Sequence, residues 1–323
     1  MSKDVVIQTS DLTKFYEEIL AVDHINFDVK RGEIFGFLGP NGAGKTTTIR
    51  ILTGLSKPTE GKASVLGFDI NSEIVEAKRH IGVVPEISNL YDEFSAIDNL
   101  LFMAQLYGVP RPQRRKRAEE LLKIFGLHER KDSPFRTFSR GMKRALTIAA
   151  ALIHNPKLLF LDEPTVGLDV VAARSLRNLI GNLRQQGITI FLTTHYLEEA
   201  DLLCGRVAIL VKGQIIKIDA PGVLKASAEE ESAIEFSFAR DTPKLLEELS
   251  DRLPETKIAA VDYNKVRIYG GIPSDVYDNV LKFAKEKSIE IQSVNSIKPS
   301  LEDAFIKITG LSPTVMAIEK GGK

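Results

Sequence analysis

Short apolar runs, bounded by glycine, proline and charged residues, recur over the first 220 residues of the chain. Runs of this length predict buried strands. Helical patterns separate several of them, which favours a mostly parallel sheet with an antiparallel edge. The predicted strands are Val5–Thr9, Ile25–Val29, Glu33–Leu38, His80–Val84, Leu158–Leu161, Thr189–Thr193 and Arg206–Leu210. We therefore predict an α/β domain over residues 1–222.

One block within this domain is helical throughout. Between Asn89 and Thr137 the apolar positions follow helical spacing, with a break at Gly108–Pro112. We interpret the block as a helical subdomain, at residues 89–140, inserted in the α/β core. It contains the strongest local charge, Arg111–Arg117, which is either a solvated helix face or a surface for lipid headgroups or an acidic partner.

The composition changes at Gly222–Glu231, where we predict a linker over residues 223–232. The order βαββαβ follows, which predicts a ferredoxin-like α+β domain at residues 233–310 and a flexible tail at residues 311–323. An RNA-recognition domain has the same order, but Val266–Gly271 lacks the interleaved aromatic residues that stack on bases. The predicted elements are strand Ala233–Phe238, helix Pro243–Leu253, strands Lys257–Asp262 and Lys265–Tyr269, helix Ser274–Lys287, strand Ile289–Ile297 and helix Leu301–Ile308.

The 323 residues, 43% hydrophobic and 27% charged, suit a soluble globular protein long enough for two domains. The 43 acidic and 43 basic residues cancel, so no global field favours nucleic acid. The apolar run Ala145–Ile153 is shorter than the roughly 20 residues of a membrane span, and residues 1–11 lack the apolar core of a secretory signal. The single cysteine, Cys204, excludes an internal disulfide and is expected to be a packing residue. We expect a cytoplasmic protein whose membrane association comes through a partner.

A glycine loop follows the strand Glu33–Leu38 and opens a helix over Lys45–Leu55. It matches the phosphate-binding pattern Gly-x-x-x-x-Gly-Lys-Ser/Thr. In this pattern the backbone N–H groups and the helix start face the phosphates, Lys45 reaches the β- and γ-phosphates, and the Thr46 hydroxyl binds Mg²⁺. The predicted phosphate-binding residues are Gly39, Pro40, Asn41, Gly42, Ala43, Gly44, Lys45, Thr46 and Thr47.

Two further motifs accompany the loop. Asp162 ends an apolar strand and is placed to hold the same Mg²⁺, while Glu163 is our candidate for polarising the attacking water. The segment Phe138–Met142 precedes a helical run, so that Ser139 and the first N–H groups of that helix form another anion site.

In this order the motifs resemble the ATP-binding subunit of ABC transporters over Val5–Ala220, in particular the drug-resistance and sodium-extrusion exporters of the ABC-2 type. The family signature LSGGQ corresponds to Phe138–Met142, in which Ser139 and Gly141 match while Arg140 and Met142 depart. The resemblance implies a P-loop NTPase fold with an ABC-type core, a mixed sheet and a helical subdomain. It also implies the cofactors ATP and Mg²⁺. Ser139 and Gly141 would then contact the γ-phosphate of an ATP molecule that is bound by the opposite protomer.

The resemblance assigns four more residues. Tyr16 takes the place of an aromatic that stacks on adenine, although neighbouring Phe15 leaves the register open and a core role remains an alternative. His195 matches the switch histidine that contacts the γ-phosphate, and Asp169 matches the loop that crosses to the second protomer. Glu86 stands where the family has a glutamine that reaches Mg²⁺ and water. It keeps the oxygen but adds a negative charge, and a solvated loop residue is the alternative.

These features predict an ATP-hydrolysing motor subunit of an ABC exporter. We expect it to act as a homodimer bound to an integral membrane permease at the inner face of the cell membrane, without nucleic acid. The alternative is a soluble ABC ATPase acting on ribosomes or DNA, which usually has two motif sets or a long coiled coil. The C-terminal domain, including Pro299–Phe305, resembles the domain appended to such exporters, and we favour a dimer-supporting or regulatory role over ligand sensing.

Overall fold

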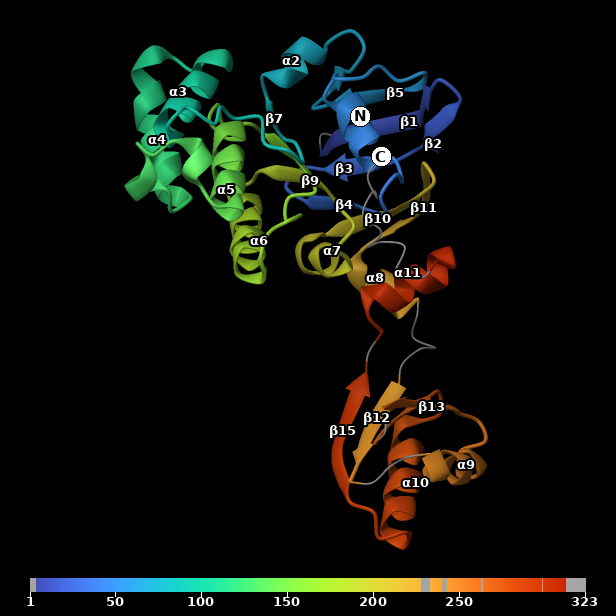
Figure 1. Ribbon diagram of the computed structural model, residues 1–323. Coiled ribbons are helices and arrows are strands. Elements are labelled where there is room, and N and C mark those ends of the chain that lie inside the picture. Colours follow the sequence, from blue (N-terminus) through green and yellow to red (C-terminus); the bar gives the residue numbers. More distant parts are fainter. Residues whose placement is uncertain (1–3, 228–232, 240–242, 263, 298, 312–323) are drawn as a thin grey trace. The chain divides into compact units, whose positions relative to one another are not determined.

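The computed structural model describes residues 4–227, 233–239, 243–262, 264–297 and 299–311 (Figure 1). They form two compact units, which meet in sequence between Pro221 and Gly222. The predicted tail, from residue 312 onward, and residues 228–232 of the predicted linker lie outside the described residues. Residues 223–226 of the predicted linker belong to the short helix α8 (Pro221–Ala226).

The main sheet of the first unit has the order β11-β10-β4-β9-β8-β7. All neighbouring strands are parallel except the edge pair β10 and β11, as the apolar pattern predicted. Its strands are β4 (Ile34–Leu38), β7 (Ile81–Val84), β8 (Leu158–Asp162), β9 (Thr189–Thr194), β10 (Arg206–Val211) and β11 (Gln214–Asp219). Every residue of β4, β8 and β9 is buried, because central strands of a parallel sheet are covered on both faces.

Phenylalanines from three of these strands form the centre of the core. The rings of Phe37 and Phe191 lie 4.9 Å apart between centroids, and Phe160 lies 5.5 Å from Phe191. The lone thiol, Cys204, packs on β4, where a Cβ added to Gly36 would lie 2.5 Å from its Sγ. The side chain is buried, which confirms its predicted role as a packing residue, and this burial raises the pKa of the thiol.

A second, antiparallel sheet in the same unit was not predicted. It contains β1 (Val5–Tyr16), β2 (Ile19–Ile25), β3 (Asp28–Lys30), β5 (Glu60–Val65) and β6 (Phe68–Asp69). The prediction of one strand over Ile25–Val29 is wrong, because Asn26 and Phe27 separate β2 from β3. There the Asn26 amide donates to Asp11 and His24, and the Phe27 N–H donates to the hydroxyl of Thr9. Side-chain bonds of this kind replace those of a strand ladder.

The predicted helical block contains α3 and α4, followed by short 3₁₀ turns rather than continuous helix. Helix α5, which comes after the block in the chain, lies with α3 and α4 at one end of this unit (Figure 1). Gly108, with φ 71°, and Pro110 separate α3 from α4, as predicted. The helices are α1 (Lys45–Leu52), α2 (Ile74–Lys78), α3 (Ala96–Leu106), α4 (Arg111–Ile124), α5 (Arg140–Ala151), α6 (Val170–Gln185) and α7 (Leu197–Leu203), with 3₁₀ turns η1 (His128–Arg130) and η2 (Phe135–Thr137). Across the described residues, none of the helices combines the length and apolar character needed to cross a bilayer.

The second unit has the predicted βαββαβ order, followed by a helix. Its antiparallel sheet has the order β13-β14-β12-β15, which is the ferredoxin-like arrangement. Phe236, Phe238 and Phe283 are fully buried between this sheet and its helices. The elements are β12 (Ala233–Phe238), α9 (Pro243–Arg252), β13 (Lys257–Asp262), β14 (Lys265–Tyr269), α10 (Pro273–Glu286), β15 (Ile291–Ile297) and α11 (Leu301–Thr309).

We predict that a chain ending at Ala220 still folds and binds nucleotide. No strand of the main sheet lies beyond Asp219, and each unit has its own apolar core. Thermal unfolding and titration with a fluorescent ATP analogue, alongside the full chain, check this. Loss of nucleotide binding by the shortened chain in a folded state would contradict the division into units.

Candidate functional site

A cavity of about 570 Å³ lies at the carboxyl ends of β4, β8 and β9. Ligands bind at this edge in open α/β sheets, because the loops that leave parallel strands converge there. Most of the predicted phosphate-binding residues line the cavity, together with Glu86, Glu163 and His195. The lining residues are Ala21, Asn41, Gly42, Ala43, Gly44, Lys45, Thr46, Thr47, Glu86, Glu163, Val166, Gly167, Leu168, His195 and Tyr196.

The glycine loop has the conformation that phosphate binding requires. Gly44 has φ 102°, and a Cβ there would lie 2.4 Å from the Ala21 carbonyl oxygen. A Cβ at Gly39 would lie 2.2 Å from the carbonyl oxygen of Leu210, so that this position admits only glycine. Helix α1 begins at Lys45 without a side-chain cap, which leaves its first N–H groups available to an anion.

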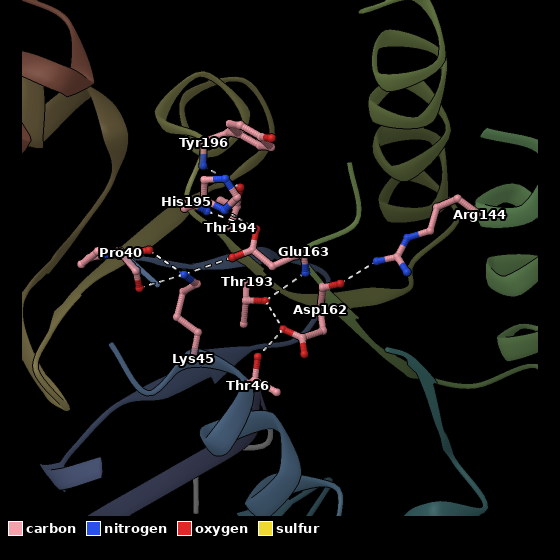
Figure 2. A network of polar contacts seen from close by, with 11 residues as sticks. Pro40, Lys45, Thr46, Arg144, Asp162, Glu163, Thr193, Thr194, His195 and Tyr196 are labelled. Carbon is pink, nitrogen blue, oxygen red and sulfur yellow. Dashed lines mark hydrogen bonds and ion pairs between the residues drawn. The ribbon is translucent and has the colours of Figure 1, made fainter. Parts of the chain in front are cut away.

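Figure 2 shows the Lys45 side chain between Pro40 and Glu163. Its side chain is 5% exposed, and Nζ donates to the carbonyl oxygens of Gly39 at 2.5 Å and Pro40 at 3.1 Å. Nζ also forms an ion pair with Glu163 Oε1 at 3.0 Å. The buried ammonium is thus surrounded by oxygen atoms of the chain, and phosphate oxygens can take their place as hydrogen-bond acceptors.

Glu163 lies between Lys45 and His195. The second carboxylate oxygen, Oε2, accepts from His195 Nδ1 at 3.0 Å and from the His195 backbone N–H at 3.3 Å. Burial raises the pKa of Glu163, but the bond from His195 and the charge of Lys45 together hold it below its usual value. The residue has φ 46°, which is uncommon for a non-glycine residue, and Figure 2 shows its carboxylate between Lys45 and His195.

Asp162 faces the start of α1 instead. Its Oδ1 accepts from the Thr46 hydroxyl at 3.2 Å and from the Thr193 hydroxyl at 2.6 Å. A carboxylate and a hydroxyl oxygen at this spacing fit Mg²⁺, which takes few protein ligands and completes its shell with phosphate oxygens and water. Within the described ranges no group of three His, Cys, Asp or Glu side chains could hold a metal alone.

The signature residues do not line this cavity. Ser139 is the N-cap of α5, where its hydroxyl accepts from the Met142 N–H at 3.3 Å, and Asp169 caps α6 by accepting from Ala172 at 2.8 Å. Gly141 packs closely on α6, because a Cβ there would lie 2.9 Å from the Cβ of Ala172. The structure therefore gives these three residues local roles and brings none of them to the phosphate loop of the same chain.

Tyr16 also lies outside the lining of the cavity. It ends β1, its side chain is 40% exposed, and the ammonium of Lys14 lies 5.0 Å from its ring centroid. An exposed ring at a strand end can stack on a flat ligand. The alternative of a core aromatic does not fit its exposure.

Four residues near the site were not singled out from the sequence. Thr193 lies beside Asp162 on β9 and accepts the Glu163 N–H at 3.1 Å, and the ring of Tyr196 lies 4.1 Å from that of His195. The buried Arg144 guanidinium donates to the Asp162 carbonyl oxygen. Parallel pairing of the predicted strands Leu158–Leu161 and Thr189–Thr193 could have identified Thr193, whereas Arg144 and the buried Glu199 required the tertiary structure.

Comparison with known proteins identifies the family. Residues 22–166 match the family model described as ABC transporter. The chain is 34% identical over 306 residues to the linearmycin resistance ATP-binding protein LnrL of Bacillus subtilis (strain 168), covering 94% of this chain and 98% of LnrL. It is 36% identical over 316 residues to the bacitracin transport ATP-binding protein BcrA of Bacillus licheniformis, covering 94% and 97%. The chain belongs to the ABC transporter ATP-binding proteins.

A solved structure agrees with this membership. The dimeric post-hydrolysis structure of the ATP-binding cassette MJ0796, bound to ADP and Pi, is 28% identical and has a TM-score of 0.60 over 66% of this chain and 98% of that one. The chain is therefore an ATP-binding subunit that hydrolyses ATP to power transport, and the resemblance inferred from the motifs is confirmed.

Glu199 generates a prediction about pH. It is 1% exposed, and burial raises its pKa from 4.5 to about 7. The negative charge of nearby Glu163 also raises the pKa of Glu199. The hydroxyls of Thr194 and Thr165 and the positive charge of Arg177 lower it. The folded state therefore binds more protons than the unfolded state between pH 4.5 and 7, and stability falls as the pH rises through that window.

We expect Glu199→Gln to remove this loss. The free energy of unfolding of Glu199→Gln, taken relative to that of the native protein, should rise by about 3 kcal/mol between acidic and neutral pH. This is the free energy that corresponds to raising the pKa of one carboxyl from 4.5 to about 7 on folding. Denaturant unfolding at several pH values measures it, with the exposed neighbour Glu198→Gln as the control. Parallel stability curves for native protein and Glu199→Gln would contradict the raised pKa.

Proposed function

We propose that this chain is the motor subunit of an exporter, in which each ATP is bound between the phosphate loop of one protomer and the Ser139–Gly141 helix start of its partner. One observation carries the proposal. Most of the predicted phosphate-loop residues line one cavity, and Thr46 among them bonds Asp162, whereas Ser139 and Gly141 do not line that cavity. The helix start can therefore contact a loop-bound phosphate only if that phosphate is held by another molecule, and an isologous dimer supplies both half-sites at once.

The cradle suggests a division of labour. Thr46 and Asp162 would hold Mg²⁺, which when bound neutralises phosphate charge. Lys45 would exchange the carboxylate of Glu163 for oxygens of the β- and γ-phosphates, since its three donors now meet only oxygen atoms of the chain. Once released by Lys45, Glu163 would polarise the attacking water, and His195 would keep its carboxylate ionised and oriented.

Glu86 lines the same cavity and is the charge that departs from the family pattern. Its side chain is exposed, as a solvated loop residue would be, but it lines the cavity, which supports contact with Mg²⁺ or with water. Beside a bound cation its carboxylate would be an additional ligand, whereas without the cation it would repel phosphate. We therefore expect nucleotide binding to depend more steeply on Mg²⁺ than it would with glutamine at this position.

The partner and location follow from the proposed role. Closing the dimer on two ATP molecules and reopening it after hydrolysis is a population shift that a separate membrane permease would convert into transport. The subunit would then lie on the cytoplasmic face of the membrane. The names of LnrL and BcrA, which refer to antibiotic resistance and transport, support an exporter over the ribosome- or DNA-acting alternative.

We predict that Lys45→Ala reduces ATP turnover by about 10²-fold or more, because the buried cation that meets the phosphates is lost. Steady-state phosphate release measures it. Lys62→Ala, which removes an exposed lysine on β5, is the matched control. Turnover within a few fold of the native rate would remove Lys45 from the phosphate site.

We predict that Glu163→Gln binds ATP and accumulates as a dimer. Glutamine cannot accept the proton of the attacking water, so the bridging γ-phosphate persists. Size-exclusion chromatography with ATP and Mg²⁺ checks this, with Glu198→Gln as the control. A Glu163→Gln protein that binds ATP and remains monomeric would refute the two-sided site.

A further inference from the structure

Arg144 is a buried arginine in the second turn of α5, five residues after Ser139, and it has no role in the function described above. Its side chain is 7% exposed and donates four hydrogen bonds, all to backbone carbonyl oxygens. Two acceptors, Pro85 and Glu86, belong to the loop after β7, and the other two are Asp162 and Pro164. No ion pair of Arg144 with a carboxylate is present in the described part of the chain.

The four hydrogen bonds of the Arg144 guanidinium connect two segments of the chain, the loop after β7 and the end of β8. Nη2 donates to the Asp162 carbonyl oxygen at 2.5 Å and Nε to that of Pro164 at 2.9 Å, so one side of the fork holds the residues on each side of Glu163. Nη1 donates to Pro85 and, at 3.2 Å, to Glu86. Figure 2 shows the guanidinium reaching Asp162 from α5, on the side away from Lys45.

A buried guanidinium is retained only where its donors are satisfied, because the charge loses its hydration. Burial lowers the pKa of Arg144 to about 10, while the charges of Asp162, Glu199, Glu86 and Glu163 oppose that shift. The side chain is therefore charged at neutral pH. Its planar fork fixes the directions of its donors, so the two segments cannot shift relative to each other without breaking bonds.

We propose that Arg144 is a positioning residue for ATP hydrolysis. It holds the backbone on both sides of Glu163 and the backbone of Glu86 at fixed positions relative to the helix that begins at Ser139. The left-handed backbone of Glu163 is uncommon for its residue type, and Arg144 is the side chain that ties the flanking carbonyls in place. The inference rests on the proposed role of Glu163 but does not depend on dimer formation.

The test compares Arg144→Gln and Arg144→Lys with the native full-length protein. Arg114→Gln is the matched control, because Arg114 lies in the helical block and donates to a single carbonyl, that of Val109. For Arg144→Gln we expect kcat to fall about tenfold or more while KM for ATP changes little, which is typical of losing a partner that orients a catalytic group. Arg144→Lys should lie between Arg144→Gln and the native protein, since an ammonium keeps the charge without the fork.

Hydrogen exchange separates positioning from a general loss of stability. Amide exchange in Pro85–Leu90 and in Glu163–Leu168 should become faster in Arg144→Gln, while β10 and β11 remain unchanged. If Arg144→Gln does not fold, the same two measurements on Arg144→Lys decide. A kcat within twofold of native, or a lower kcat with unchanged exchange in both segments, would overturn the proposal. A monomeric Glu163→Gln protein would instead count against the two-sided site and leave this result standing.

Discussion

A buried ion pair between Lys45 and Glu163 connects the phosphate loop to the end of β8, and the rest of the site is arranged around it. Removing two charges from water is costly unless hydrogen bonds compensate for the lost hydration. Here the Gly39 and Pro40 carbonyls share the ammonium and His195 shares the carboxylate. An anion that enters the loop therefore competes with a carboxylate already in place, and its binding changes the surroundings of Glu163.

The parallel sheet explains why these groups meet. Adjacent strands β8 and β9 end at the same edge, which places Asp162 opposite Thr193 and Glu163 near His195. The loop after β4 reaches the same edge with Lys45 and Thr46. The antiparallel sheet contributes Ala21 to the lining of the cavity, and α5 contributes Arg144. Asp162, Glu163 and His195 thus lie at or next to the ends of buried strands, which hold their side chains in fixed positions.

Much of this organisation could be predicted because local patterns determine it. The glycine loop and the Asp162–Glu163 pair depend on short spacings in the sequence, and the parallel sheet depends on apolar runs. The βαββαβ order of the second unit was also predicted, because the apolar spacing differs between its strands and its helices. The bend at Asn26 was missed because its hydrogen bonds join residues distant in sequence, which local propensities do not reveal. The Asn26 side chain accepts from the Asp11 N–H, and the Phe27 N–H donates to the Thr9 hydroxyl. Arg144 was missed for a related reason, since four carbonyls in two remote segments define its environment.

Cys204 is buried against Gly36, and this burial affects how the protein can be labelled for measurements of its motion. Thiol reagents need an accessible thiolate, and burial disfavours that form of the native cysteine. A cysteine engineered onto the surface would accordingly be the site that takes up a maleimide dye or spin label. Distances between labelled subunits could then be recorded through a turnover cycle without first removing the natural residue.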